Sequence, residues 1–327
     1  MKKHKVDFLD LVIIRSCQLA CEGCCTFSDH KEINGLIEPA DAEEAVKFWA
    51  QYISPGRVHL FGGEPTMHPR LIDWIRLARK YFPDSGANWL NTNGYYLDKL
   101  FDHINELFVD NFTFVSVTHH TTVEPYNSLV LGNYAELQRL VQEAWQKRLP
   151  NGNWQWIPND DWSSGEYKKF IWLTNINSGQ QVVIFNMTFQ SGPEGKFVSH
   201  YQRRGLELKP WQDYNDISDA AARNHSMCHI KNYVQLYENR LWKCPPRAVL
   251  NQTLETYNLQ NTQEWTDYYN KYQSLGTDAS EDEINQWFVR QSGPENTCNM
   301  CGFVAKETSL YAGQQHLPKK MFKLKSA

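Results

Sequence analysis

Short apolar runs alternate with amphipathic stretches along the first 150 residues. The apolar runs have strand length, and they occupy residues 7–15, 57–61, 87–90 and 112–118. Between and after them, apolar side chains recur every three or four positions, which predicts helices over residues 39–53, 69–82, 96–107 and 134–148. Four strand–helix repeats of this kind predict an α/β fold in which crossover helices cover a parallel sheet.

The pattern changes after Pro150. Residues 151–165 are rich in Asn, Asp, Gly and Trp, and we expect an irregular loop there. Two runs with strand character follow, over 169–174 and 181–190, and the turn residues between them indicate a hairpin. The pattern does not decide whether this hairpin extends the sheet or replaces its fifth strand.

Composition narrows the class of protein. A chain of 327 residues suits one large domain with an appendage, or two domains. The net charge of −4 argues against duplex nucleic acid as a partner. No apolar stretch reaches the roughly 18 residues of a membrane span. We expect no secretory signal, because the apolar run after the basic N-terminus is short and is interrupted by Asp7 and Asp10. We therefore expect a cytoplasmic protein with reduced thiols and no membrane association.

Three cysteines with C-x3-C-x2-C spacing, Cys17, Cys21 and Cys24, follow the first strand directly. Three thiolates at this spacing can hold three corners of an iron–sulfur cube and leave one iron without a protein ligand. A zinc site or scattered structural thiols are the alternatives. A second motif, Phe61-Gly62-Gly63-Glu64-Pro65, stands at the end of the second predicted strand.

In this order, the two motifs resemble the signatures of radical S-adenosylmethionine enzymes. The resemblance implies a partial (β/α)6 barrel, a [4Fe-4S] cluster on the three cysteines, S-adenosylmethionine on the open iron, and an electron donor such as flavodoxin or ferredoxin. It also implies reductive cleavage of the cofactor to a 5′-deoxyadenosyl radical, which takes a hydrogen atom from substrate. Gly62 and Gly63 would admit the methionine moiety, Glu64 would accept from its ammonium group, and Pro65 would stiffen the turn.

Polar residues at the later strand ends extend this predicted cofactor site. Asn91 and Asn93 are candidate ribose or carboxylate contacts, with turn formation as the alternative for both. Ser116 and Thr118 lie on the same side of their strand because side chains alternate. Family members commonly carry an aromatic residue before the third cysteine; Gly23 stands here instead, so we consider Phe27 for packing against the adenine.

Three further residues have two interpretations each. Cys25 is either a hydrogen-atom donor to the substrate or a small buried residue beside the loop, and we favour the second. His119, at a strand end, is either a general base or a histidine satisfied by its neighbours. Arg15 either contacts substrate or pairs with an acid.

A second cysteine set lies in the last third of the chain. Cys228 and Cys244 flank a predicted hairpin that turns at Glu238-Asn239, and Cys298-Asn299-Met300-Cys301 follows. Four converging thiolates suit either structural zinc or a four-iron cluster. The arrangement resembles the twitch module, a shortened relative of the SPASM module, although Asn239 stands where that family usually has Gly. The resemblance implies one auxiliary [4Fe-4S] cluster with four cysteine ligands.

These inferences predict a barrel over 6–222 with an insertion around 150–200, an auxiliary-cluster domain over 223–316, and a basic tail over 317–327. The first functional hypothesis is a two-electron oxidation of a small polar substrate. The alternative is modification of a peptide substrate by crosslinking or epimerisation. A third hypothesis, a non-catalytic binding protein stabilised by zinc, predicts no iron.

Overall fold

A computed structural model describes residues 3–19, 24–28, 34–85, 88–110, 113–120, 124–159, 168–189, 202–204, 207–209, 220–226, 228 and 230–300. Cys21, Gly23, Cys301 and the basic tail lie outside these residues. The predictions that concern them are therefore not addressed by the structure.

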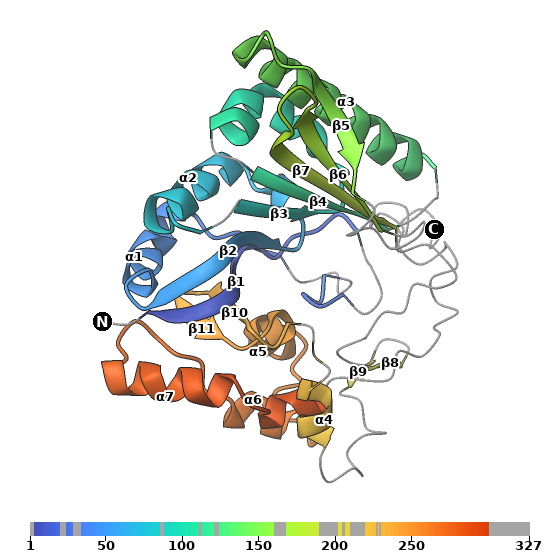
Figure 1. Ribbon diagram of the computed structural model, residues 1–327. Helices are drawn as coiled ribbons and strands as arrows, with labels where there is room; N and C mark the ends of the chain where they lie inside the picture. Colours follow the sequence, from blue (N-terminus) through green and yellow to red (C-terminus); the bar gives the residue numbers. More distant parts are fainter. Residues whose placement is uncertain are drawn as a thin grey trace.

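One mixed sheet of nine strands organises the described chain (Figure 1), in the order β11-β10-β1-β2-β3-β4-β7-β6-β5. The strands are β1 (His4–Ile14), β2 (Ile53–Gly62), β3 (Asn88–Thr92), β4 (Thr113–His119), β5 (Trp154–Pro158), β6 (Lys168–Asn175), β7 (Gln180–Phe189), β10 (Tyr233–Tyr237) and β11 (Arg240–Trp242). Strands β10, β1, β2, β3, β4 and β7 are parallel, whereas β11 at one edge and β6 and β5 at the other run antiparallel to their neighbours. The short strands β8 (Gln202–Arg204) and β9 (Glu207–Lys209) form a separate pair.

Helices cover the sheet from both sides. Figure 1 shows α1 (Pro39–Trp49), α2 (Leu71–Tyr81) and α3 (Tyr126–Arg148) along one side, and α5 (Pro245–Thr256) on the other, near β10 and β11. The remaining helical segments are η1 (Pro65–Met67), η2 (Leu97–His103), η3 (Asn105–Asp110), α4 (Ala220–Ser226), α6 (Thr266–Lys271), α7 (Glu281–Gln291) and η5 (Asn296–Met300). None of the helices in the described ranges is both long and apolar enough to cross a lipid bilayer.

The two faces of the sheet differ in chemistry. Leu9, Leu11 and Ile13 of β1 belong to the main apolar core with residues of α1, α2 and α3. The alternate positions carry a second apolar cluster, in which Val12 packs with Phe27 and with residues of α5, together with several polar side chains. The polar groups therefore gather on the face opposite α1, α2 and α3, because side chains alternate along each strand.

Most predicted elements of the first half are confirmed, with shifted ends. The hairpin after Pro150 is confirmed as β6 and β7; β7 takes the place beside β4, and β6 and β5 extend the sheet. The predicted irregular loop over 151–165 is wrong in part, because 154–158 pair with β6 as β5. The segment predicted as a helix over 96–107 forms η2 and η3; Leu97 and Leu100 are buried three residues apart, the repeat of a 3-10 helix.

The C-terminal hairpin joins the main sheet. Glu238 and Asn239 both have positive φ, 49° and 62°, which is the backbone of a tight hairpin turn and explains Asn at the second position. Strand β10 pairs in parallel with β1, with Phe8 opposite Tyr233 and Asp10 opposite Gln235. Residues beyond the predicted boundary at 222 thus share a sheet with the N-terminal strand. Closure of the sheet into a six-unit barrel, and the division into domains, stay predictions.

Candidate functional site at the cysteine loop

The cysteine loop leaves the C-terminal end of β1 and carries three described thiols. Cys17, Cys24 and Cys25 are all half-buried. Around Cys17 Sγ lie the backbone N–H of Leu19, at 3.4 Å, and the side-chain amide of Asn93, at 3.7 Å. Donors of this kind stabilise a thiolate, the form that binds metal. Cys24 Sγ lies 3.2 Å from the hydroxyl of Thr26.

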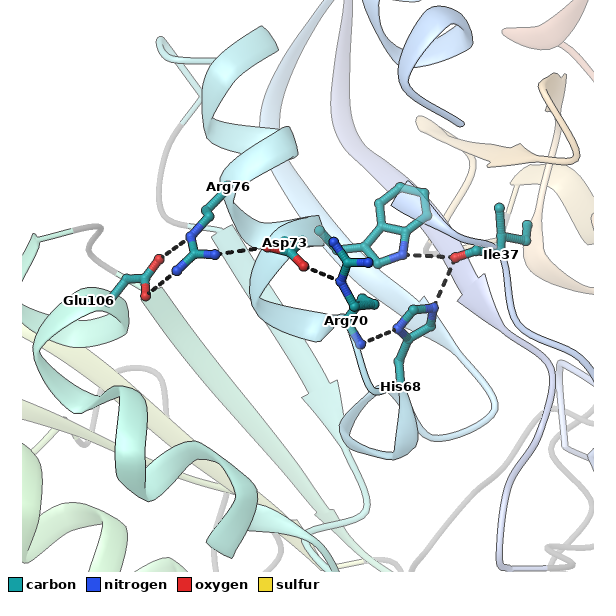
Figure 2. Close-up of polar contacts among 7 residues, drawn as sticks. Ile37, His68, Arg70, Asp73, Arg76 and Glu106 are labelled. Atoms are coloured by element: carbon teal, nitrogen blue, oxygen red, sulfur yellow. Dashed lines mark hydrogen bonds and ion pairs between the residues drawn. The ribbon is translucent and has the colours of Figure 1, made fainter. Parts of the chain in front are cut away.

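Backbone contacts hold both ends of this loop. Leu36 forms a bridge with Ile14 at the end of β1, and Ile37 N donates to Ile13 O at 2.9 Å. Ile37 O accepts from His68 Nε2 at 2.9 Å (Figure 2). It also accepts from the indole N–H of Trp74 at 3.0 Å. The return segment of the loop is thereby fixed to the turn that follows the glycine motif.

The glycine motif lies directly against the start of the cysteine loop. Gly63 N donates to Ile14 O at 2.8 Å, and Glu64 N donates to Ser16 O at 2.9 Å. A Cβ on Gly62, which has φ of +145°, would meet Ile14 O at 2.0 Å, and one on Gly63 would meet Ser16 O at 2.2 Å. Both positions require glycine because backbone approaches backbone. Pro65 begins the short helix η1.

Glu64 is the buried centre of this turn, with 1 % exposure. Its Oε1 accepts from the backbone N–H and hydroxyl of Thr66, at 3.0 and 2.5 Å, and from the hydroxyl of Thr92 at 2.6 Å. Its Oε2 accepts from Asn93 N at 2.7 Å. Burial raises the pKa of this carboxyl group, and the donors oppose that rise. The carboxylate thus connects the glycine motif to the end of β3, and an ammonium group would have to compete with these four donors.

The predicted residues of the later strand ends have different surroundings. Asn93 Oδ1 accepts from Gln18 of the cysteine loop at 2.8 Å, so Asn93 connects the loop to β3. Ser116 donates to Asn186 of β7 at 2.6 Å. Asn91 and Thr118 lie half-buried on the same face as Ser116, by strand register and alternation. Asn186 escaped prediction because the pairing of β4 with β7 is absent from the local sequence pattern.

Arg15 and His119 also have buried surroundings, each 1–2 % exposed. The guanidinium of Arg15 donates to Gln252 and Thr253 of α5 and to Thr26 O of the loop, and so joins the loop to α5. Its described partners are neutral groups rather than the predicted acid. Burial lowers the pKa of His119, and a hydrogen bond with Asn127 opposes that change.

Three cysteines of the second set come together. Cys244 caps α5, which begins with two prolines; Cys298 lies in η5, and Asn224 of α4 donates to Cys298 O at 2.8 Å. Burial, together with smaller contributions from negative charge on Cys298 and Cys228, raises the pKa of Cys244 to about 12. The three thiols are thus close enough to influence each other's ionisation, whereas the described residues alone form no complete metal-ligand group.

Buried cations accompany these thiols. Lys243 Nζ donates to Gln291 O at 2.7 Å and to Gly293 O at 2.9 Å, which fixes the segment before Cys298. Arg247 is fully buried and lies 4.7 Å from the ring centre of Tyr272. Its Nε and Nη2 have no hydrogen-bond partner in the described part of the chain. Sequence reasoning missed both residues. Their positive charge suits a group of thiolates, whichever metal the thiolates hold.

A comparison with protein families finds a match in the first half of the chain. A family of 4Fe-4S single cluster domains matches residues 10–141, less than half of the chain, and this span contains both motifs. No curated protein matches.

Solved structures align at low identity. The crystal structure of BtrN in complex with AdoMet and 2-DOIA covers 97% of this chain and 100% of its own, with 14% identity and a TM-score of 0.44. The polyhistidine-tagged anSMEcpe with bound AdoMet covers 98% and 95%, with 13% identity and a TM-score of 0.39. SuiB from Streptococcus suis bound to S-adenosylmethionine covers 43% and 39%, with 12% identity and a TM-score of 0.26.

Proposed function

We propose that this protein is a radical S-adenosylmethionine enzyme that oxidises a small polar substrate by two electrons. The observation that carries the proposal is the backbone pairing of Gly63 and Glu64 with the start of the cysteine loop. It brings the two glycines against the backbone of residues 14–16, directly before the first cysteine of the motif. The match of a 4Fe-4S cluster family over residues 10–141 supports the same reading.

The residues present fit the cofactors. Cys17, Cys21 and Cys24 would hold the first cluster, and N–H groups already surround Cys17 Sγ. When bound, the cluster and S-adenosylmethionine supply a 5′-deoxyadenosyl radical, given an electron from a donor such as flavodoxin or ferredoxin. The Gly62–Pro65 turn would receive the methionine end. We assign Glu64 the role of holding this turn against β3, since its oxygens already accept four hydrogen bonds.

The proposal includes a second four-iron cluster on Cys228, Cys244, Cys298 and Cys301. Support comes from the approach of the three described thiols and from the buried cations Lys243 and Arg247 beside them. With four cysteine ligands, every iron would be capped, so this cluster would accept an electron rather than bind substrate.

Metal analysis tests both clusters. After anaerobic reconstitution we expect about eight irons per chain, and about four in a Cys17/Cys21/Cys24→Ala variant. Cys25→Ala is the matched control and should keep about eight, because Cys25 is not a proposed ligand. If the wild type holds about four irons, the triple variant holds none, and both retain zinc, then the C-terminal cysteines form a structural zinc site. Absence of iron from the reconstituted wild type would refute the proposal.

Cofactor cleavage tests the reaction class. Reconstituted protein with dithionite and S-adenosylmethionine should form 5′-deoxyadenosine, and the triple cysteine variant should form none. Cofactor cleavage by a protein that holds fewer than eight irons would support the radical reaction but contradict the second cluster as the electron acceptor. Full cluster content without cleavage would contradict the proposed chemistry.

A further inference from the structure

A row of polar side chains crosses four neighbouring strands on the face of the sheet opposite α1, α2 and α3. Strand register places Gln235 of β10 beside Asp10 of β1, Asp10 beside His59 of β2, and His59 beside Trp89 of β3. Gln235, Asp10 and His59 are 0, 2 and 5 % exposed. Burial of adjacent polar side chains is costly unless their hydrogen bonds are satisfied.

Contacts within the row order the histidine. Gln235 Nε2 donates to Asp10 Oδ2 at 2.6 Å, and Asp10 Oδ1 lies 2.7 Å from His59 Nδ1. A carboxyl oxygen beside Nδ1 places the ring proton on Nδ1. The lone pair is then on Nε2, which is the arrangement of a carboxylate-oriented general base.

Four polar atoms of the row are buried without a hydrogen bond. Across the described chain, no hydrogen bond reaches His59 Nε2, Gln235 Oε1 or Trp89 Nε1, and Asp10 Oδ1 lies at ion-pair distance from His59 Nδ1 without forming one. In folded proteins, nearly all buried polar atoms are paired, so a set of neighbouring exceptions indicates a missing ligand. The unused atoms comprise three acceptors, Asp10 Oδ1, His59 Nε2 and Gln235 Oε1, and one donor, the indole N–H of Trp89.

Aromatic rings surround the row. The ring of Phe8 lies 4.2 Å from that of His59, and Tyr233 lies 4.4 Å from Phe8. Trp89 is 4.9 Å from His59, and the guanidinium of Arg57 lies 4.8 Å over the Trp89 ring. Flat apolar walls beside a few directed polar atoms are typical of small-molecule sites.

The row also lies on the two strands that lead to the motifs. Asp10 is on β1, which ends at Ile14 directly before the cysteine loop, and His59 is on β2, which ends at Gly62 of the glycine motif. A substrate beside His59 would therefore lie along the strands that carry the cysteine loop and the glycine motif.

From these contacts we propose that Asp10 and His59 form an acid–base dyad that binds a polyhydroxylated ring and removes a hydroxyl proton. Hydroxyl groups both donate and accept, so one polyol can satisfy His59 Nε2, Gln235 Oε1 and the Trp89 N–H. The aromatic rings suit the C–H faces of such a ring.

The proton transfer rests on the proposed function and accounts for the proton that the two-electron oxidation releases. Oxidation of H–C–OH to C=O removes one hydrogen atom, one proton and one electron. His59 Nε2 would take the proton; bound S-adenosylmethionine would supply the acceptor of the hydrogen atom, and a cluster held by the C-terminal cysteines would supply the acceptor of the electron. Asp10 then faces an imidazolium, which its carboxylate stabilises.

Calorimetric binding of a polyol panel tests the site without radical chemistry. The probes are myo-inositol, glucose and glucosamine, with cyclohexanol as a ring that carries one hydroxyl. We expect at least one polyol to bind, cyclohexanol to bind at least tenfold more weakly, and His59→Gln and Trp89→Phe each to weaken polyol binding roughly 5- to 10-fold. His103→Gln, at a half-exposed position of η2, is the matched control and should bind as the wild type does. Failure of all three polyols to bind would overturn the proposal.

Turnover of the tightest-binding polyol tests the dyad. His59→Gln should lower kcat by roughly 10²- to 10⁴-fold, whereas the control His103→Gln should turn over polyol as the wild type does. Asp10→Asn, which keeps the shape of the side chain, should lower kcat with little change of KM. Wild-type kcat in His59→Gln would overturn the proposal. Loss of cofactor cleavage in the wild type would instead contradict the proposed function.

Discussion

Gly63→Ala should disrupt the contact that joins the two motifs. The added Cβ would lie 2.2 Å from Ser16 O and 2.6 Å from Arg15 O, and both atoms are backbone, so no side-chain rotation relieves the overlap. Movement of this segment would weaken the hydrogen bonds from Gly63 N to Ile14 O and from Glu64 N to Ser16 O. Overpacking costs about 1–3 kcal/mol and each lost hydrogen bond about 1 kcal/mol, so we expect a loss of about 3–5 kcal/mol.

Urea denaturation measures this loss, and iron content after reconstitution measures its effect on the loop. Gly132→Ala is the matched control, because its Cβ meets nothing within 4 Å and it lies inside α3. There we expect a gain of about 0.5–1 kcal/mol, since alanine favours a helix over glycine. A Gly63→Ala protein with wild-type stability and full iron content would refute the reasoning.

Three further substitutions probe the surroundings of the site. Glu64→Gln replaces one acceptor oxygen with a donor that faces Thr66 or Asn93, and we expect unfolding studies to show a loss of about 3 kcal/mol. Burial lowers the pKa of His68 in the folded protein. The stability that neutral His68 contributes is therefore present above the pKa of an unfolded histidine, near 6.5, and is lost as the pH falls toward the folded pKa. His68→Gln should make the free energy of unfolding, measured by urea titration, fall less between pH 7 and pH 5. Arg247→Met removes the buried cation near Cys244 and should weaken cobalt(II) binding at the C-terminal thiols about tenfold in a spectroscopic titration, with unchanged affinity arguing against the electrostatic role.

Local patterns in the sequence predicted the elements that carry the cysteine loop and the glycine motif. Both motifs directly follow strands, and apolar runs of strand length identify those strands without knowledge of their partners. The turn at Glu238 and Asn239 was predictable for a similar reason, because asparagine tolerates a left-handed backbone.

Features that depend on register between distant strands were not predictable. Asp10 and His59 are separated by 48 intervening residues, and only the pairing of β1 with β2 brings the carboxyl group to the imidazole. The contact of Ser116 with Asn186 likewise depends on β7 taking the place beside β4. The strand at 154–158 was missed because it is short and is flanked by residues rich in Asn, Asp and Gly, whereas pairing with β6 satisfies its backbone.

The parallel pairing of β1 with β10 has a consequence for how the chain is made. Strand β1 leaves the ribosome long before one of its two neighbours, β10, which begins only at Tyr233. Until then, one side of β1 presents unpaired N–H and C=O groups, and exposed edges of this kind pair readily with other chains. A fragment that ends at residue 222 should therefore aggregate, and supplying residues 223–327 as a separate chain should suppress that aggregation. Formation of this contact, distant in sequence, would then set the pace of folding.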